Sequence, residues 1–156
     1  MSVLARFRKP GGFQQLLAVV ETCEPIKQKA LLHLIAVEDP GWAQLVRLKS
    51  LSFERILSWP VEILMELTPP LSDKVLSTIY QLAQQTPGLG EKWIHSLPTI
   101  KAREIQSLAD DLASTPSERI AAVVLLIQVT REMESEGQIR FAHFDPLLQV
   151  DKDIAA

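Results

Sequence analysis

Residue types that carry chemistry are scarce in this sequence. Cys23 is the single cysteine among 156 residues, so no disulfide can form within the chain, and nothing points to an oxidising compartment. The three histidines are scattered, and neither HExxH nor CxxC spacing occurs. The glycines at 11–12 and 88–90 lack the strand-turn-helix context and the Lys-Ser/Thr pair of a phosphate loop. We therefore expect no enzyme activity, no metal and no cofactor.

Long hydrophobic runs and an excess of positive charge are also absent. The longest apolar run, 120–129, is half of the roughly 20 residues that a membrane-spanning helix needs. The first residues, MSVLARFRKPGG, lack the apolar core of a signal peptide. A net charge of -3 argues against a general nucleic-acid binder, and we expect the small basic cluster of Arg6, Arg8 and Lys9 to be solvated. These features favour a cytoplasmic protein without membrane insertion.

The residues that are abundant favour helices. Hydrophobic residues make up 47% of the chain, enough for a packed core, and ten prolines divide the sequence into segments. Within the segments apolar residues recur every three or four positions, which is the helical period, and no strand-like alternation stands out. The pattern predicts an all-α protein with helices near 13–22, 25–37, 41–49, 53–57, 60–67, 72–85, 89–96, 98–113 and 116–137.

Several of these helices have recognisable beginnings. Asp39, Ser72 and Ser114 or Thr115 precede helical segments as N-caps, and Pro40 and Pro116 suit a first helical turn. The second helix is expected to bury Ala30, Leu31, Leu34 and Ile35. The run 120–129 is apolar almost all round, so we expect it to be buried on most faces at the centre of a C-terminal bundle. The tail from Arg140 packs as a short helix or stays mobile.

The segment 98–113 carries the most distinctive charge pattern. The apolar residues Leu97, Ile105, Leu108 and Leu112 gather on one side, and Arg103, Ser107, Asp110 and Ser114 recur on the opposite side. Arg103 and Asp110 lie two turns apart, too far to pair directly. Each charge is therefore open to a partner, although a solvated helix face gives the same pattern.

Five segments of the chain, in order, resemble one family. They are KPGGFQQLLAVVE (9–21), VEDPGWAQLVRLKSLSFE (37–54), LGEKWIHSL (89–97), AREIQSLADDL (102–112) and TREMESEGQI (130–139). This order and spacing is similar to the C-terminal half of the flagellar motor switch protein FliG, with its PGG start, its DPxxA helix, its hinge and its charged helix. The resemblance spans about 9–139.

The resemblance implies a particular architecture. After an N-terminal segment at 1–9, an armadillo-like unit of three helices covers 10–50, and a six-helix bundle with the charged helix covers 51–139. The two form a right-handed helical superfold, and 140–156 is a tail. Leu51 and Phe53 fall where the family has its hinge.

The resemblance also implies function. Similar proteins are non-catalytic and contact stator or rotor proteins of the bacterial flagellum, at the cytoplasmic face of the membrane, or stack helical units on a neighbouring copy. Arg103, Asp110 and Asp111 match the charged positions of the family, and Arg119 substitutes for a further arginine. These four residues are the expected protein-binding residues, with no nucleic-acid partner.

The sequence departs from the family pattern at several points. A lysine of the family falls at or near Ala83, Ser50-Leu51 replaces the Met-Phe of the hinge, and no N-terminal helical units precede residue 9. A short stand-alone relative and an excised fragment both fit. The alternative function is a helical adaptor or regulator without a motor role. A third hypothesis is a helical enzyme subunit, or the cytoplasmic sensor of a transporter with a related fold.

Overall fold

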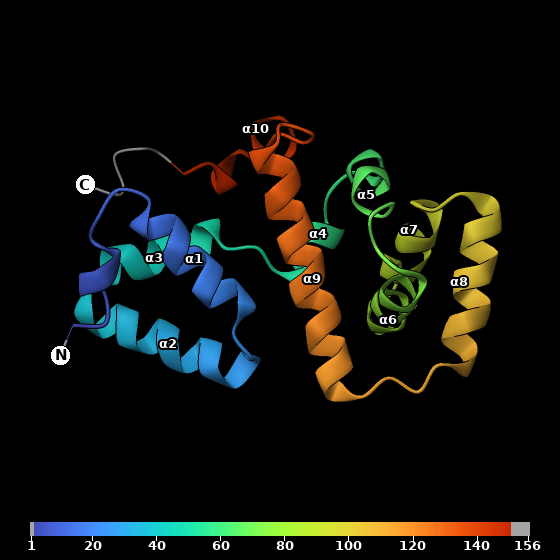
Figure 1. Cartoon of the computed structure of the whole chain (residues 1–156), viewed down its shortest axis with the longest axis horizontal. Helices are drawn as coiled ribbons and strands as arrows, with labels where there is room; N and C mark the ends of the chain where they lie inside the picture. Colours follow the sequence, from blue (N-terminus) through green and yellow to red (C-terminus); the bar gives the residue numbers. More distant parts are fainter. Residues whose placement is uncertain (1, 151–156) are drawn as a thin grey trace. The chain divides into compact units, whose positions relative to one another are not determined.

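Helices account for all regular secondary structure in residues 2–150, the part of the chain that the computed structural model describes. In chain order they are η1 (Ala5–Phe7), α1 (Gly12–Thr22), α2 (Pro25–Glu38), α3 (Pro40–Lys49), α4 (Phe53–Leu57), α5 (Val61–Leu67), α6 (Asp73–Ala83), α7 (Leu89–His95), α8 (Thr99–Asp111), α9 (Pro116–Ser135), α10 (Phe141–Phe144) and η2 (Pro146–Leu148). The expected all-α fold is confirmed, as a three-helix unit (α1–α3) followed by a six-helix bundle (α4–α9) (Figure 1).

Side-chain caps set the starts of α3, α6 and α9 as the sequence predicted. The carboxylate of Asp39 accepts a hydrogen bond from the Trp42 N–H at 3.1 Å. The hydroxyls of Ser72 and Thr115 accept from the N–H groups three residues on, at 3.3 and 3.1 Å. Each bond satisfies an amide that has no partner inside its helix, so these boundaries follow from local sequence.

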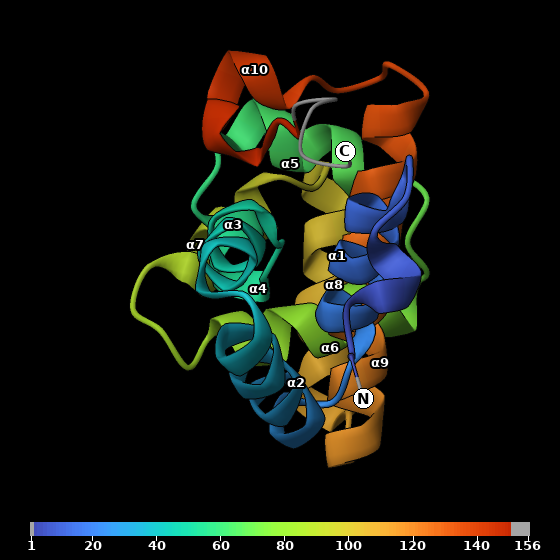
Figure 2. The same cartoon turned by 90° about the vertical axis from the view of Figure 1, so that its left-hand side faces the viewer.

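The chain divides into two units, and the first combines residues 2–51 with residues 141–150 of the described range. Its core lies among η1, α1, α2 and α3 (Figure 2). The rings of Phe13 and Trp42 pack edge to face, with their centroids 5.4 Å apart. Arg8, expected to be solvated, stacks its guanidinium 4.1 Å from the Trp42 ring centroid and pairs with Asp39. The segment before α1 is therefore part of this unit, because Leu4 and Phe7 are buried in its core.

The C-terminal segment returns to the first unit after the six-helix bundle. The ammonium of Lys49, at the end of α3, donates to the Leu147 carbonyl at 3.0 Å and also to the Gln149 carbonyl. Leu148 is fully buried, and Val150 packs on the core of the same unit. Of the two alternatives for the tail, the structure shows packing through residue 150.

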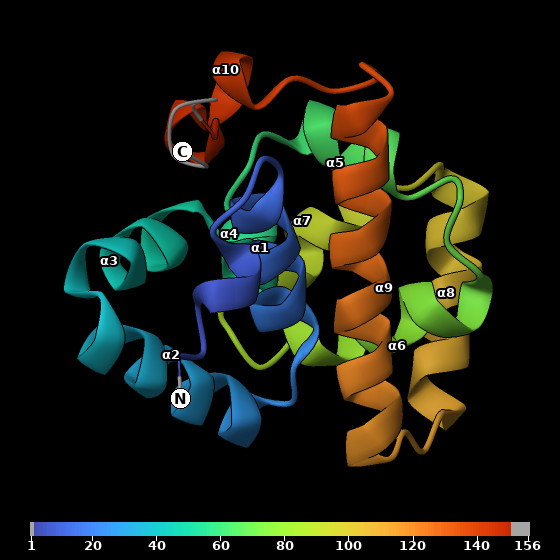
Figure 3. The same ribbon diagram turned by 60° about the vertical axis from the view of Figure 1, so that its left-hand side comes forward.

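The second unit, residues 52–140, is organised around α6. Helices α7, α8 and α9 all pack against α6, and Figure 3 shows α9 beside it. Trp93 of α7 is fully buried, and its indole Nε1 donates to the Leu76 carbonyl of α6 at 3.1 Å. A buried indole needs such a partner, so this bond fixes α7 on α6.

The expectation that 120–129 is buried on most faces is wrong. Leu126 and Ile127 are buried, but Leu125 is 39% exposed and Ala121 is exposed. The physical reason is the place of α9 in the bundle. It packs on the short helices α4 and α5 and on α6, whereas α6 contacts α7, α8 and α9, so the amphipathic helix α6 forms the centre.

Replacing Lys49 with methionine should lower the free energy of unfolding of the protein by about 1–3 kcal/mol, because two carbonyls of the C-terminal segment lose the charged donor of a buried side chain. Urea denaturation measures the loss. The exposed Lys29→Met variant is the control and should lie within about 0.5 kcal/mol of wild type. Equal stability of the two variants would contradict a role for Lys49 in holding the tail.

Candidate functional site

The charged helix α8 packs on the bundle through a narrow stripe of buried residues. Ala102, Ile105 and Ala109 are its buried residues, and the helix packs against α6 and α7. The expected apolar side is only partly correct, since Leu108 is 40% exposed. On a helical projection Leu108 lies at the flank of the stripe, because the small residues Ala102 and Ala109 mark the side on which the backbone approaches α6.

A side chain from α6 fixes the C-terminal end of α8. The amide nitrogen of Gln81 donates to the carbonyls of Ala109 and Leu112, at 2.8 and 2.7 Å. Its amide oxygen accepts from the Ser114 hydroxyl at 2.8 Å. Carbonyls at a helix end have no partner inside the helix, so Gln81 satisfies two of them and holds the loop that follows.

An ion pair fixes the other end. Lys101, in the first turn of α8, lies 2.6 Å from the Asp73 carboxylate at the start of α6, and 4.0 Å from Glu104. The hydrogen bond to Asp73 raises the pKa of Lys101 above its ordinary value. Lys101 is thus paired within the bundle. Arg103 is the basic residue of α8 that forms no ion pair among the described residues.

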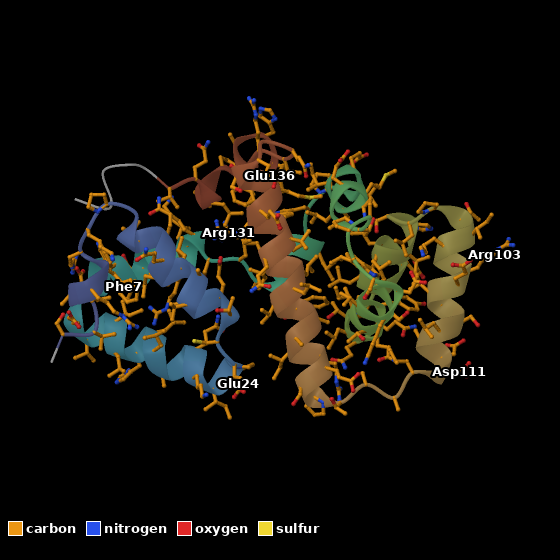
Figure 4. All side chains as sticks on the ribbon, in the orientation of Figure 1. Phe7, Glu24, Arg103, Asp111, Arg131 and Glu136 are labelled. Carbon is orange, nitrogen blue, oxygen red and sulfur yellow. The ribbon has the colours of Figure 1, made fainter. Side chains whose placement is uncertain are left out.

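Three of the four expected binding residues share the outward face of α8. Arg103, Asp110 and Asp111 are exposed, and none of them forms an ion pair within residues 2–150. Arg103 points away from the rest of the second unit, and Asp111 marks the opposite end of the helix (Figure 4). Arg103 and Asp110 are separated by about 10 Å along the axis. Ile100, which sequence reasoning missed, lies on this face and is 75% exposed.

The signs of these charges oppose the helix dipole. The first turn of α8 holds no acidic residue and the last turn holds no basic one, whereas Lys101 and Arg103 lie toward its start and Asp110 and Asp111 at its end. A helix is stabilised by the reverse arrangement, and each misplaced charge costs about 0.3–1 kcal/mol. The arrangement therefore does not serve the stability of α8. Its exposed face carries Arg103, with Glu104 beside it, toward the start of the helix and two aspartates at the end.

The remaining predicted residues lie elsewhere. Arg119 is on α9, half-buried, and donates to the Ser114 and Thr115 carbonyls at 3.3 and 3.4 Å, so its guanidinium serves the loop between α8 and α9. Ala83 is fully buried and adds no charge to the surface. Leu51 is buried at the end of the first unit, with its N–H donating to the Glu21 carboxylate, and Phe53 begins α4 in the second.

The first unit presents a second surface, which we call the α2 stripe: Ile26, Ala30, Leu34 and Val37. All four are exposed, Ile26 at 85% and Val37 at 73%, and their spacing places them on one side of α2. This corrects the expectation that Ala30 and Leu34 are buried. A unit of three helices has room for only one side of α2, which Ile35 occupies. Exposed apolar stripes of this kind are common at protein interaction sites.

Other chemistry has no structural support in the described residues. Among residues 2–150 no group of three or more His, Cys, Asp or Glu side chains is arranged to hold a metal ion. Cys23 is half-buried at the end of α1. None of the described helices is long and apolar enough to cross a membrane.

Comparison with known proteins identifies the fold. No protein-family model matches the chain. No curated protein matches it either. Two crystal structures of FliG fragments from H. pylori do match: one with a TM-score of 0.60 and 18% identity over 83% of this chain, the other with 0.54 and 19% over 85%. The fold is that of the FliG fragments. The resemblance found in the sequence is thereby confirmed, and this chain spans 61% and 58% of the two FliG fragments.

Removing the two acidic charges at the end of α8 should stabilise the protein. Because both aspartates oppose the helix dipole, the free energy of unfolding of the Asp110→Asn/Asp111→Asn variant should be about 0.5–1 kcal/mol higher than that of wild type. Denaturation at low and high salt measures the difference, which should shrink as salt screens it. A destabilised variant would show that the aspartates have a structural role.

Proposed function

We propose that this protein is a non-catalytic interaction module of the flagellar rotor switch, which contacts a stator or rotor protein through the outward face of α8. The observation that carries the proposal is the unpaired, dipole-opposing set of Arg103, Asp110 and Asp111 on a helix held rigidly by its other face. The likeness to the FliG fragments supports it. Such a module would work in the cytoplasm, at the membrane face of the flagellar base.

The chemistry of the α8 face suits a contact that forms and breaks repeatedly. Exposed charge pairs contribute only about 0–1 kcal/mol each, but they orient the encounter of two proteins. Opposite signs at the two ends of α8 select a partner with the complementary order of charge. Ile100 adds an apolar contact beside Arg103. This combination gives directional specificity with low affinity, as a moving interface requires.

The α2 stripe supplies the second contact of the proposed function. Ile26, Leu34 and Val37 extend over about 16 Å of helix, a length suited to stacking against another helical unit. A second copy of the chain carries the same stripe, so we assign this surface to stacking between neighbours. The junction of Leu51 and Phe53 would then act as the hinge between a stacked unit and a partner-binding unit.

Exchanging Arg103 and Asp110 tests the role of α8. The Arg103→Asp/Asp110→Arg variant keeps the net charge and improves the match to the helix dipole, so it should stay folded while losing its partner. Capture of the purified cytoplasmic loop of the host's stator protein, and swimming of the host in soft agar, should both fall at least about tenfold.

The matched control exchanges two charges on α7, Glu91→Lys/Lys92→Glu, and should leave capture and swimming unchanged. Equal capture by wild type and the α8 exchange would disprove the assignment of the α8 face. Normal swimming after deletion of the gene would instead favour the adaptor without a motor role.

Charging the α2 stripe tests stacking. The Ile26→Asp/Val37→Asp variant should remain monomeric where wild type self-associates, because each aspartate would be desolvated in the contact. Sedimentation velocity over a hundredfold concentration range gives the answer. A wild type that stays monomeric throughout would contradict stacking between copies.

A further inference from the structure

A groove on the second unit lies away from α8. It has a volume of about 450 Å³ and runs between the Pro69-Pro70 turn and the last two turns of α9. Its lining comprises Pro69, Pro70, Val129, Glu132, Met133, Glu136 and Gln138. The size is within the range of roughly 300–1,000 Å³ of pockets that bind ligands.

The walls of the groove are rigid. The N–H of Gln138 donates to the Met133 carbonyl at 2.9 Å, and the N–H of Gly137 donates to Glu134 at 3.1 Å. With Gly137 at a φ of 78°, these bonds form a Schellman motif, which closes α9 and leaves its last turn ordered. On the other side the ring of each proline fixes its backbone φ. The groove is thus formed before any partner arrives.

The groove combines an apolar surface with one acidic edge. Val129 and Met133 lie side by side on α9, and Glu132 and Glu136 line the helix next to them; both glutamates are exposed and form no ion pair within the described residues. The last turn of α9 holds no basic residue, so the negative end of the helix dipole adds to the carboxylates. Figure 4 shows Glu136 at this end of the helix.

We propose that this groove binds a basic amphipathic segment of a partner protein. Two exposed carboxylates beside an apolar surface match lysine or arginine side chains that accompany apolar residues on a partner segment. Glu132 and Glu136 stand one turn apart, the spacing of cations at positions i and i+4 of a partner helix. Met133 is a flexible and polarisable side chain, suited to an aliphatic anchor between those cations. This site is separate from the α8 face and does not depend on the proposed motor role.

Methionine methyl NMR tests the groove directly. Met1, Met65 and Met133 are the three methionines, so a chain with ¹³C-labelled methionine methyls gives few signals. Titration with a 14-residue amphipathic peptide of leucine and lysine should shift the Met133 methyl signal saturably. The same peptide with glutamate in place of lysine should leave that signal in place.

Paired variants separate the groove from general attraction to an acidic protein. Glu132→Lys/Glu136→Lys should weaken binding at least about tenfold, since two charge pairs become repulsions at the site. Glu24→Lys/Glu91→Lys makes the same change of net charge at two exposed sites elsewhere and should change affinity less than about twofold. The groove variants favour the dipole of α9 and should fold, which circular dichroism checks. An unmoved Met133 signal, or equal loss in both variants, would overturn the proposal.

Discussion

The attachment of α8 to α6 is the interaction on which the proposed site depends. Two small residues and one isoleucine form the buried stripe of α8, too little apolar surface to fix a helix by itself. Polar contacts complete the attachment: Gln81 binds the carbonyls at one end, and the ion pair of Lys101 with Asp73 holds the other. Because Gln81 and Asp73 both belong to α6, a single helix holds both ends of α8 and keeps its outward face exposed.

This support explains how α8 tolerates charges that oppose its dipole. An isolated helix with Arg103 near its start and two aspartates at its end would be destabilised. In the bundle, Gln81 already satisfies carbonyls at that end, and packing on α6 and α7 holds the helix in place. The cost in stability remains, which agrees with the proposed binding role of these residues. The end of α9 shows the same feature beside its groove.

The first unit depends on a different interaction: after the six-helix bundle, the C-terminal segment packs against the first unit. Lys49 and Leu148 bring residues 147–149 onto a core that three helices alone leave small. The core is further extended by Leu4 and Phe7, and Arg8 covers Trp42. One side of α2 remains uncovered even so, and this is why the α2 stripe is exposed.

Local sequence alone determined the helices of this protein and most of their boundaries, because caps such as Asp39, Ser72 and Thr115, together with the prolines, act within a few residues. It also located Arg103, Asp110 and Asp111 on one face, since helical periodicity fixes which residues share a side. Tertiary structure decided which side is buried. Leu34 and Leu108 are as apolar as Ile35 and Ile105, and only the positions of neighbouring helices exclude water from one member of each pair. The roles of Arg119, Lys49 and Gln81 depend on partners in other elements, which no local pattern specifies.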